Sequence, residues 1–459
     1  MSADTRAASP TPPAARSAAA ETVAARPAAA AHPWLMPGDP APWFKAASNI
    51  NANFDFSTAA GRIVVVTLFG SGSDAASKPL IDGILGEAAF FAHPDYYFFG
   101  VSVDRKDRED ARLTQARPGM DIFWDLDGKV SRLFRALPET VPEGASSETL
   151  TAAYRPVTYV LDYNLRVVAT VSHPDAGQHA AAVRQMLKRL PKLPAPRPAS
   201  LQAPVLVVPN VFERELCRRL IDGYGLNGGN ESGFMREREG KTVLVLDHKH
   251  KRRSDWSIED RALCALLQER VKRRLLPEIA KAFQFKATRM ERYIVACYDA
   301  EPGGYFRPHR DNTTKGTAHR RFAVTINLNS EEYEGGDLMF PEFGRATYRA
   351  PTGGAVVFSC SMLHEALPVS KGRRYAFLPF LYDEAGAAIR AANNEFLADG
   401  LTPYRFAGEK AGGVKAEVTK VAAKATAAGS SRTKAAPPAK AKTAPKTTKA
   451  GAKPVTKKK

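Results

Sequence analysis

The chain has 459 residues, of which 44% are hydrophobic and 25% are charged, and its formal net charge is +18. This length predicts two or three domains, and the hydrophobic content is enough for packed cores, which excludes a chain disordered throughout. The four cysteines show no regular spacing, which excludes a disulfide scaffold and a cysteine-ligated zinc site and favours the cytoplasm. No run approaches the roughly 18 apolar residues of a membrane span, which excludes a membrane protein.

The two ends of the chain are predicted to be disordered. Residues 1–32 are rich in Ala and Pro and lack the continuous apolar core of a secretory signal, so they are expected to form a disordered leader. Residues 409–459 contain 14 Lys or Arg and two acidic residues, so this basic tail carries +12 of the net charge. Such a tail can contact nucleic-acid phosphates without sequence specificity, or it can serve as a solubilising extension, and both interpretations stay open.

Residues 33–192 are predicted to form a first domain in which strands alternate with helices. Buried strands appear as short apolar runs bounded by turn residues, whereas helices show apolar residues at three- and four-residue intervals. The expected elements, in chain order, are a strand at Arg62–Gly70, a helix at Lys78–Ala92, a strand at Tyr96–Asp104, a strand, turn and helix at Phe123–Leu137, a hairpin at Pro156–Val171 and a helix at Ala180–Leu193. This alternation predicts an α/β fold with helices packed on a sheet.

Several stretches of this domain resemble a peroxiredoxin or another thioredoxin-fold protein: GDPAPWF (Gly38–Phe44), the first apolar strand, DLDGKVSRLF and YVLDYNLRVVATV. The resemblance spans most of residues 35–190 and implies an α/β thioredoxin-like domain, with Pro156 where many such folds have a cis-proline. Thiol chemistry is not expected, because the loop Gly70–Pro79 after the first strand has no cysteine and none precedes Cys217. The domain is therefore predicted to be redox-inactive and to be structural or to bind a partner or peptide.

Residues 193–200 form a Pro-rich linker, and residues 201–396 are predicted to form a second domain of different character. It opens with a short strand and an amphipathic helix within residues 206–224, and a longer helix follows at Trp256–Phe283. Short strands separated by Gly, Pro and Asp turns fill the remainder. This order predicts an α+β double-stranded β-helix (jelly-roll) domain with N-terminal bracing helices.

One group of residues in the second domain is typical of a metal site. His309 and Asp311 are two residues apart in PHRDN, a spacing that places both side chains on one face of a strand. His364 follows Asp311 by 53 residues, at the end of the apolar strand expected at Gly353–Leu363. Two imidazoles and one carboxylate on one face of a metal leave adjacent positions open, and this facial triad suits Fe(II). We therefore predict His309, Asp311 and His364 as catalytic metal ligands.

A cation follows the triad at a short distance along the chain. Arg374 lies ten residues after His364 on the next expected strand, where its planar guanidinium can hold the distal carboxylate of a 2-oxoglutarate co-substrate through two hydrogen bonds. The adjacent Arg373 would point to the opposite face of that strand. Tyr298, on the strand before the first ligand, can donate a further hydrogen bond. Arg374 and Tyr298 are the predicted co-substrate-binding residues.

The stretch from CYDAEPGGYFRPHRDN to LHEALPVSKGRRY resembles the prolyl 4-hydroxylase-like family of 2-oxoglutarate- and Fe(II)-dependent oxygenases, over about residues 203–383. The three predicted ligands fall on the iron ligands of the family, Arg374 on its 2-oxoglutarate base and Tyr298 on its upstream tyrosine. One departure is Asn327, where many relatives have a tyrosine that assists the distal carboxylate, so Tyr298 or Thr325 is expected to contribute more. The resemblance implies decarboxylation of 2-oxoglutarate to succinate with hydroxylation of a substrate C–H bond, and it adds ascorbate as a further cofactor.

Three functions stay open. The first is a hydroxylase with a prolyl residue of a peptide or protein as the favoured substrate, which rests on the resemblance alone. The second is an oxygenase acting on a small molecule or a nucleic-acid base, favoured weakly by the tail and by the basic stretch Asp247–Trp256. The third is a non-catalytic two-domain scaffold. Within the basic stretch, His248 and His250 could form a second metal pair, but we interpret this stretch as a solvated loop.

Overall fold

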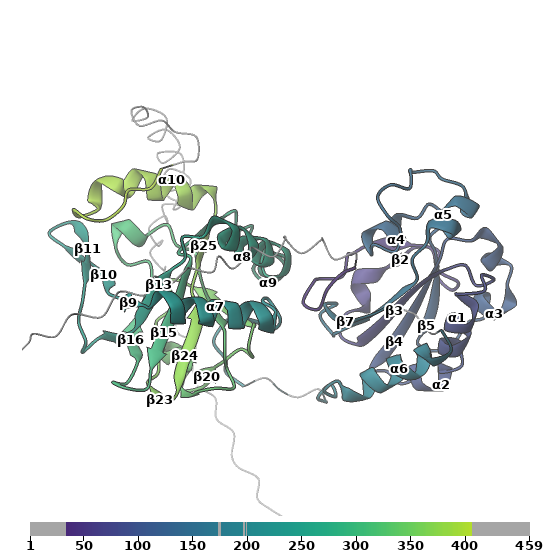
Figure 1. The fold of residues 1–459 in the computed structure, drawn as a ribbon, viewed down its shortest axis with the longest axis horizontal. Helices are drawn as coiled ribbons and strands as arrows, with labels where there is room; N and C mark the ends of the chain where they lie inside the picture. Colours follow the sequence, from purple (N-terminus) through teal and green to yellow (C-terminus); the bar gives the residue numbers. More distant parts are fainter. Residues whose placement is uncertain (1–33, 173–175, 196–197, 199, 406–459) are drawn as a thin grey trace, which may run out of the picture.

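The computed structural model describes residues 34–172, 176–195, 198 and 200–405 of the chain. Figure 1 shows two bodies of ordered chain, an N-terminal one built around β3 and β4 and a C-terminal one built around β15 and β24. The leader predicted at residues 1–32 and the basic tail predicted at residues 409–459 lie outside the described residues. Within the described ranges, no helix combines the length and the apolar character that a membrane crossing requires.

The N-terminal unit is built on a five-stranded sheet in the order β5-β4-β3-β6-β7. The strands β3, β4 and β5 run parallel, whereas β6 and β7 form an antiparallel hairpin beside β3. The sheet strands are β3 Ile63–Gly70, β4 Tyr96–Ser102, β5 Met120–Trp124, β6 Val157–Leu161 and β7 Val167–Ser172; the helices are α1 Lys78–Leu85, α2 Ala88–Phe91, α3 Ala111–Thr114, α4 Lys129–Leu133, α5 Ser147–Ala153 and α6 Ala176–Arg189; the short strands β1 Lys45–Ala46 and β2 Phe54–Asp55 pair with each other. This topology confirms the predicted α/β thioredoxin-like fold.

The residues of β3 show why this sheet is covered on both faces. All eight of its residues are buried, and successive side chains of a strand point to opposite faces. Val64 and Val66 pack in one core with Phe99 and other aromatic residues, including Phe44, while Val65 packs in a second core with α1 and α6. A continuous apolar run is therefore expected here, because neither face of β3 meets water.

The loop after β3 occupies the place where a thiol would be expected in a peroxiredoxin. Ser71 Oγ donates to Asp104 Oδ2 at 2.8 Å, and Asp107 accepts hydrogen bonds from Gly72 N at 2.8 Å and from Ser102 Oγ at 2.6 Å. The loop is thus tied down by hydroxyl–carboxylate contacts, and the four cysteines of the chain all lie in the C-terminal unit. The expectation of a cis bond at Pro156 is wrong, because among the described residues only the Glu301–Pro302 bond is cis.

The C-terminal unit has two main antiparallel sheets. The larger sheet has nine strands and contains the path β14-β25-β17-β24-β15-β13-β9, with β21 paired to β17 and β8 paired to β21; the smaller has the order β12-β16-β22-β19-β20. The strands of the larger sheet are β8 Leu206–Val208, β9 Asn230–Glu231, β13 Ser254–Ser257, β14 Arg289–Glu291, β15 Ile294–Asp299, β17 Phe322–Asn327, β21 Ala355–Ser359, β24 Arg373–Phe377 and β25 Phe380–Tyr382; those of the smaller are β12 Lys251–Arg252, β16 Tyr305–His309, β19 Leu338–Met339, β20 Thr347–Tyr348 and β22 His364–Ala366. The predicted double-stranded β-helix is confirmed.

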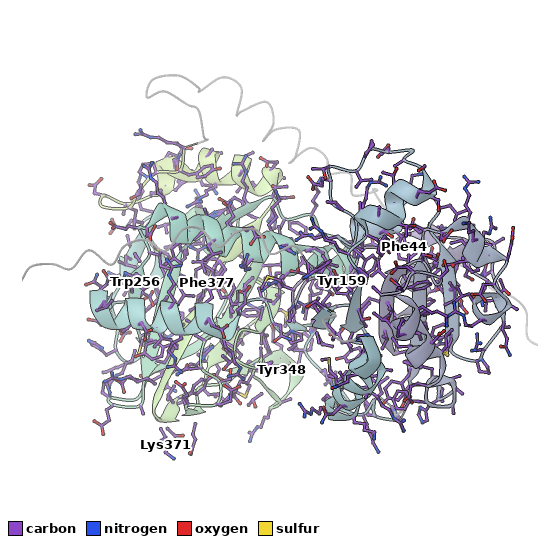
Figure 2. The ribbon with its side chains drawn as sticks, turned by 45° about the vertical axis from the view of Figure 1, so that its right-hand side comes forward. Phe44, Tyr159, Trp256, Tyr348, Lys371 and Phe377 are labelled. Carbon is purple, nitrogen blue, oxygen red and sulfur yellow. The ribbon has the colours of Figure 1, made fainter. Side chains whose placement is uncertain are left out.

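Helices α7 Arg214–Asn227, α8 Arg261–Arg274 and α9 Leu276–Phe283 pack on the larger sheet, and α10 Glu384–Ala392 follows its last strand. Two small strand pairs complete the unit: the hairpin of β10 Phe234–Arg238 with β11 Lys241–Val245, and β18 Glu334–Gly335 with β23 Val369–Lys371. Leu220 of α7 and Leu267 of α8 are fully buried against Phe377 of β24. Figure 2 shows Phe377 inside this unit, behind the helices. Because the helices cover this face, the sheet's other face is left to form a cavity.

The two units meet through buried charges. Asp39 of the N-terminal unit is 1% exposed and accepts from Arg274 Nε of α8 at 3.0 Å, and Arg273 also bonds to it. Arg166 donates to the carbonyl oxygens of Pro209 and Gly38, each at 2.6 Å. Gly38 has φ +91°, and a Cβ there would lie 2.1 Å from the oxygen of Asn210. The chain therefore needs glycine at position 38 for this close approach.

We expect Asp39→Asn to lower the free energy of unfolding by about 1–3 kcal/mol, because the fully buried Arg274 then keeps only one of its two carboxylate partners, Glu213. The measurement is chemical denaturation of the full chain. The control is Asp95→Asn, whose exposed carboxylate pairs only with exposed His93 and which should change stability by less than about 0.5 kcal/mol. Equal effects of the two substitutions would contradict a stabilising role of this interface.

Candidate metal centre and active-site cavity

Strand pairing brings the three predicted metal ligands together. The antiparallel strands β16 and β22 pair with His309 directly opposite His364, so residues 55 positions apart in sequence become neighbours. Asp311 lies just beyond β16, where its backbone N–H donates to Cys360 O at 3.0 Å. One ligand atom from each of the three residues lies within 4.8 Å of the others.

Two details of the expected placement are wrong. Asp311 does not share a strand with His309, since β16 ends at His309 and the carboxylate comes from the following turn. His364 does not close the apolar strand before it: β21 ends at Ser359, a turn intervenes, and His364 is the first residue of β22. The turns aim the side chains in both cases, because a strand alone would not have pointed all three to one place.

Backbone carbonyls fix the orientation of both imidazoles. His309 Nδ1 lies 2.8 Å from Arg307 O, and His364 Nδ1 lies 3.0 Å from Met362 O. A carbonyl oxygen can only accept, so each Nδ1 carries the proton and each Nε2 presents its lone pair. The Nε2 atoms of His364 and His309 lie 3.3 and 3.6 Å from the Asp311 carboxylate. The three donor atoms therefore converge on one point.

The charge states of the ligands suit a divalent cation. Burial, with a smaller contribution from His309, lowers the pKa of His364 to about 4, so this imidazole is neutral at pH 7. Burial alone would raise the pKa of Asp311, but the neighbouring His364 and His309 hold it well below its usual value. One anionic oxygen beside neutral nitrogen is a donor set that first-row divalent metals bind well.

Aromatic rings pack against both metal-site histidines. The ring of Phe306 stacks on His309 with centroids 3.5 Å apart and an interplanar angle of 22°, and Phe358 lies 4.5 Å from the His364 ring. Both phenylalanines are buried, which restricts the imidazole rotamers before any ligand binds.

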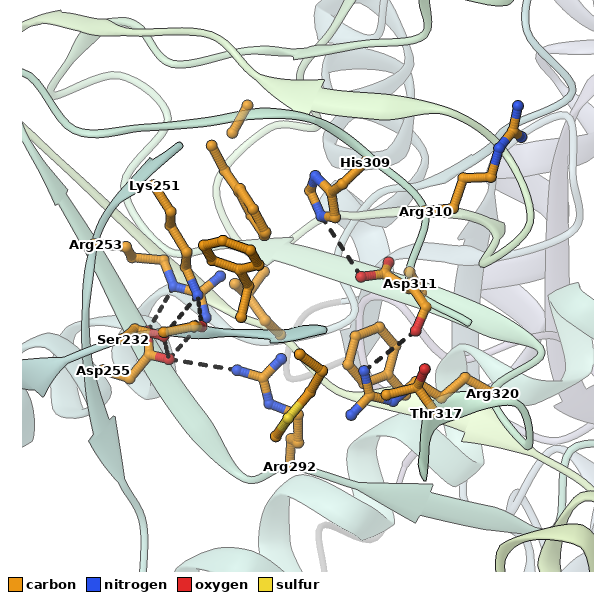
Figure 3. A pocket seen from close by; sticks show the side chains of 18 of the residues that line it. Ser232, Lys251, Arg253, Asp255, Arg292, His309, Arg310, Asp311, Thr317 and Arg320 are labelled. Atoms are coloured by element: carbon orange, nitrogen blue, oxygen red, sulfur yellow. Dashed lines mark hydrogen bonds and ion pairs between the residues drawn. The ribbon is translucent and has the colours of Figure 1, made fainter. Parts of the chain in front are cut away.

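The three residues open into a cavity of about 780 Å³, shown from close by in Figure 3. Arg374 and Tyr298 also line it. They are paired residues on the neighbouring strands β24 and β15, and the Arg374 guanidinium lies 5.0 Å from the centre of the Tyr298 ring. Arg374 is 2% exposed, and its Nε and Nη1 atoms have no hydrogen-bond partner. An unpaired buried guanidinium is costly, so it is poised to receive an anion.

The neighbours of Arg374 show how the chain positions it. Arg373 points to the opposite face, as expected, where it is exposed and donates to Asp299 at 2.6 Å. Gly336, in the loop after β18, has φ +68°, and a Cβ there would lie 2.8 Å from Val369 and 3.2 Å from Arg374 Cδ. Glycine at position 336 therefore makes room for the arginine stem.

Thr325 differs in position from Asn327, the residue that stands where many relatives have a tyrosine. Thr325 lines the cavity and is 5% exposed. Asn327 does not line it; its amide donates to Ala350 O at 2.9 Å. Of the two, only Thr325 can face a bound co-substrate in this arrangement.

The interpretation of Asp247–Trp256 as a solvated basic loop holds for Asp247–Lys249, which are exposed, but is wrong for the residues that follow. Lys251 and Arg253 are 4% and 8% exposed and line the cavity together with Asp255. The sequence contained a pattern that could have predicted this common orientation, because residues 251, 253 and 255 share one face of an extended chain. His250 also lines the cavity, whereas His248 pairs with Glu231 at 3.2 Å, so the two do not form a second metal cluster within the described residues.

Comparison with known proteins finds similarity over the part of the chain that holds this site. Residues 293–382 match the model of the 2OG-Fe(II) oxygenase superfamily, and all five predicted site residues fall inside that range. The resemblance stated for this unit is therefore confirmed. A PKHD-type hydroxylase of Pseudomonas fluorescens is 34% identical over 91 residues, which cover 18% of this chain and 39% of that protein. The chain thus spans about two fifths of the length of that curated relative, and about half of a PKHD-type hydroxylase from Synechococcus.

Two solved structures are similar to separate parts of the chain. A Trichoplax adhaerens prolyl hydroxylase, solved with a hypoxia-inducible-factor peptide fragment, has 18% identity and a TM-score of 0.31, and the match covers 41% of this chain and 86% of that chain. The peroxidoxin BcpB of Mycobacterium tuberculosis has 17% identity and a TM-score of 0.30, and the match covers 34% of this chain and 99% of that chain.

We expect His309→Ala and Asp311→Ala each to abolish binding of one divalent metal ion, because either change removes one of only three convergent donors. Anaerobic equilibrium dialysis against Fe(II) measures this. His248→Ala is the matched control: it removes an exposed histidine that is paired only with Glu231, and it should leave the metal stoichiometry at one. Full metal binding by both triad variants would show that the metal binds elsewhere.

Proposed function

We propose that this protein is an Fe(II)- and 2-oxoglutarate-dependent dioxygenase that hydroxylates a C–H bond of a peptide or protein, with a prolyl residue as the favoured target. One observation carries the proposal: a convergent His-Asp-His triad and an unpaired, buried guanidinium line the same cavity. The match of residues 293–382 to the oxygenase superfamily supports it independently.

The donor set fits iron. His309 and His364 would each supply Nε2, and Asp311 one carboxylate oxygen, which leaves adjacent coordination positions open for other ligands. Bound Fe(II), with 2-oxoglutarate, would supply the activation of O₂ and the oxidising power for C–H hydroxylation. The chain supplies the orientation of the donors, through the carbonyl oxygens of Arg307 and Met362 that fix the imidazole rings.

The cavity also fits a dicarboxylate. Arg374 offers two unpartnered N–H groups, which match the two oxygens of a carboxylate. The Tyr298 ring contacts two guanidinium groups, with its centre 5.0 Å from Arg374 and 5.7 Å from Arg253. These residues would bind and orient the distal end of 2-oxoglutarate, while its keto-acid end reaches the metal ligands.

The walls favour a peptide over a nucleic-acid base. A flipped base needs aromatic faces that are free to stack. In this cavity the Phe306 ring is already in contact with His309 and with Lys251, and the Phe380 ring with Arg320 and Arg292. The cavity reaches the β10–β11 hairpin, where Leu244 lines it and is 54% exposed. An extended peptide can cover such an apolar rim while one residue enters the cavity.

The remaining parts of the proposal rest on sequence. Ascorbate enters as a reductant through the family resemblance, and a cytoplasmic location follows from the cysteine pattern. The N-terminal unit, which lacks cysteine, would act as a structural or partner-binding domain; the domain limits proposed for the two units are residues 33–192 and 201–396. The basic tail would contribute non-specific phosphate contacts or solubility.

We expect the Fe(II)-loaded protein to convert 2-oxoglutarate to succinate, slowly without substrate and faster with it. Arg374→Gln should raise the KM for 2-oxoglutarate about 10- to 100-fold, because it removes charge-assisted hydrogen bonds that stabilise by roughly 1.5–3 kcal/mol. Succinate formation under steady-state conditions measures both quantities.

Arg373→Gln is the matched control for this experiment. It changes the adjacent arginine, whose exposed side chain pairs with Asp299 outside the cavity, and should leave the KM unchanged. A protein that binds iron but forms no succinate with any peptide substrate would favour the scaffold interpretation.

A further inference from the structure

A group of three cations, which we call the cation cluster, lines the cavity away from the metal ligands. It consists of Lys251, Arg253 and Arg292, gathered around the single carboxylate of Asp255. Figure 3 shows these side chains on one side of the cavity and His309 and Asp311 on the other. Neither Arg374 nor the triad belongs to this cluster.

Ser232 links the cluster into one built site. Its Oγ donates to Asp255 Oδ2 at 2.5 Å and accepts from Lys251 Nζ at 2.7 Å and from Arg253 Nη2 at 3.0 Å. Arg253 also donates to both oxygens of Asp255 at 2.7 Å, and Arg292 Nη2 lies 3.3 Å from the same carboxylate. Two of the three cations are more than nine-tenths buried, so their positions are fixed.

The charges of the cluster do not balance. Three basic side chains face the carboxylate of Asp255. Two further acids of the cavity already have partners: Glu291 pairs with Arg320 and Arg390, and Asp311 with His309 and His364. Burial, and then the neighbouring Arg253, lowers the pKa of Arg292 to about 10, and burial lowers the pKa of Lys251 well below its usual value. A partly buried excess of positive charge is unfavourable unless an anion enters.

The cluster is near the reaction centre but separate from the co-substrate arginine. Lys251 Nζ lies 4.9 Å from the centre of the Phe306 ring, which stacks on the metal ligand His309. Arg253 Nη1 lies 3.3 Å from the hydroxyl of Tyr298, and the Arg374 guanidinium lies 5.0 Å from the centre of the same ring. The cluster therefore adds positive charge to the cavity beyond Arg374, whereas the distal carboxylate of 2-oxoglutarate needs only one guanidinium.

We infer that the cation cluster binds an anionic group of the substrate, so that the protein hydroxylates acidic peptides, with a carboxylate or phosphate near the oxidised residue. This inference rests on the proposed function for the oxidation itself, but binding of the anion by Lys251, Arg253 and Arg292 does not require metal or turnover. Arg292 is the most accessible member, with 30% of its side chain exposed, and would meet the anion first.

The test is calorimetric titration of the metal-free full chain with short proline-containing peptides. One series carries a single glutamate moved through the flanking positions, and two matched series carry glutamine or phosphoserine there. We expect the best glutamate peptide to bind about tenfold more tightly than its glutamine counterpart. A stronger preference for phosphoserine would identify phosphate as the anion, and no preference at any position would overturn the inference.

Arg292→Gln and Lys251→Met should each remove this preference. Arg289→Gln is the matched control, because Arg289 lies three residues before Arg292 but pairs with Glu384 outside the cavity, and it should keep the preference. If Lys251→Met does not fold, the binding result for Arg292→Gln, a change at a partly exposed residue, decides the test. Variants that lose 2-oxoglutarate binding but keep the glutamate preference would assign the cluster to the co-substrate and overturn the inference. If the protein binds glutamate peptides selectively but forms no succinate, anion binding by the cation cluster is supported and the proposed oxygenase function is contradicted.

Discussion

The functional centre depends on one strand pairing. Because β16 and β22 run antiparallel with His309 opposite His364, two imidazoles from distant parts of the chain present their Nε2 atoms to one point. The turn after β16 adds Asp311, anchored by its N–H to Cys360 O. A register shift of one residue would turn a histidine to the other face of the sheet and leave the carboxylate without its partners.

The cavity beside this centre is lined by many charged side chains. Buried arginine and lysine side chains are tolerated there because most are held by carboxylates: Arg253 by Asp255 and Arg320 by Glu291. Two positions break this balance, namely the unpartnered Arg374 and the cation cluster around Asp255. Such unbalanced cations lower the stability of the free protein, as is expected of a site that binds anionic ligands.

The two units are connected by buried side-chain contacts as well as by the linker. Arg166 reaches from the N-terminal unit to the carbonyl of Pro209, and Arg274 reaches back to Asp39, so buried ionic contacts cross the boundary in both directions. A thioredoxin-like fold without cysteine cannot carry out thiol exchange. Its hydrophobic core is complete, and its Asp39 contacts α8 of the C-terminal unit.

The sequence by itself determined the order of the elements and most of the candidate site. A continuous apolar run sufficed for β3, and short strand patterns between turn residues sufficed for the β6–β7 hairpin and the jelly roll, because local apolar spacing reflects which faces are buried. The triad and Arg374 stood out because their spacing is correlated along the chain. The Arg373–Arg374 distinction followed from strand alternation alone, and the structure shows the two side chains on opposite faces.

Only the tertiary structure decided what faces the cavity. It turned the stretch around Lys251 and Arg253 inward, placed Asp311 in a turn, and excluded Asn327 from the lining. It also joined Asp39 to Arg274 across 235 positions. Charged residues look the same in a sequence whether they meet water or a cavity wall. Their environment depends on long-range strand pairing, which no local pattern encodes.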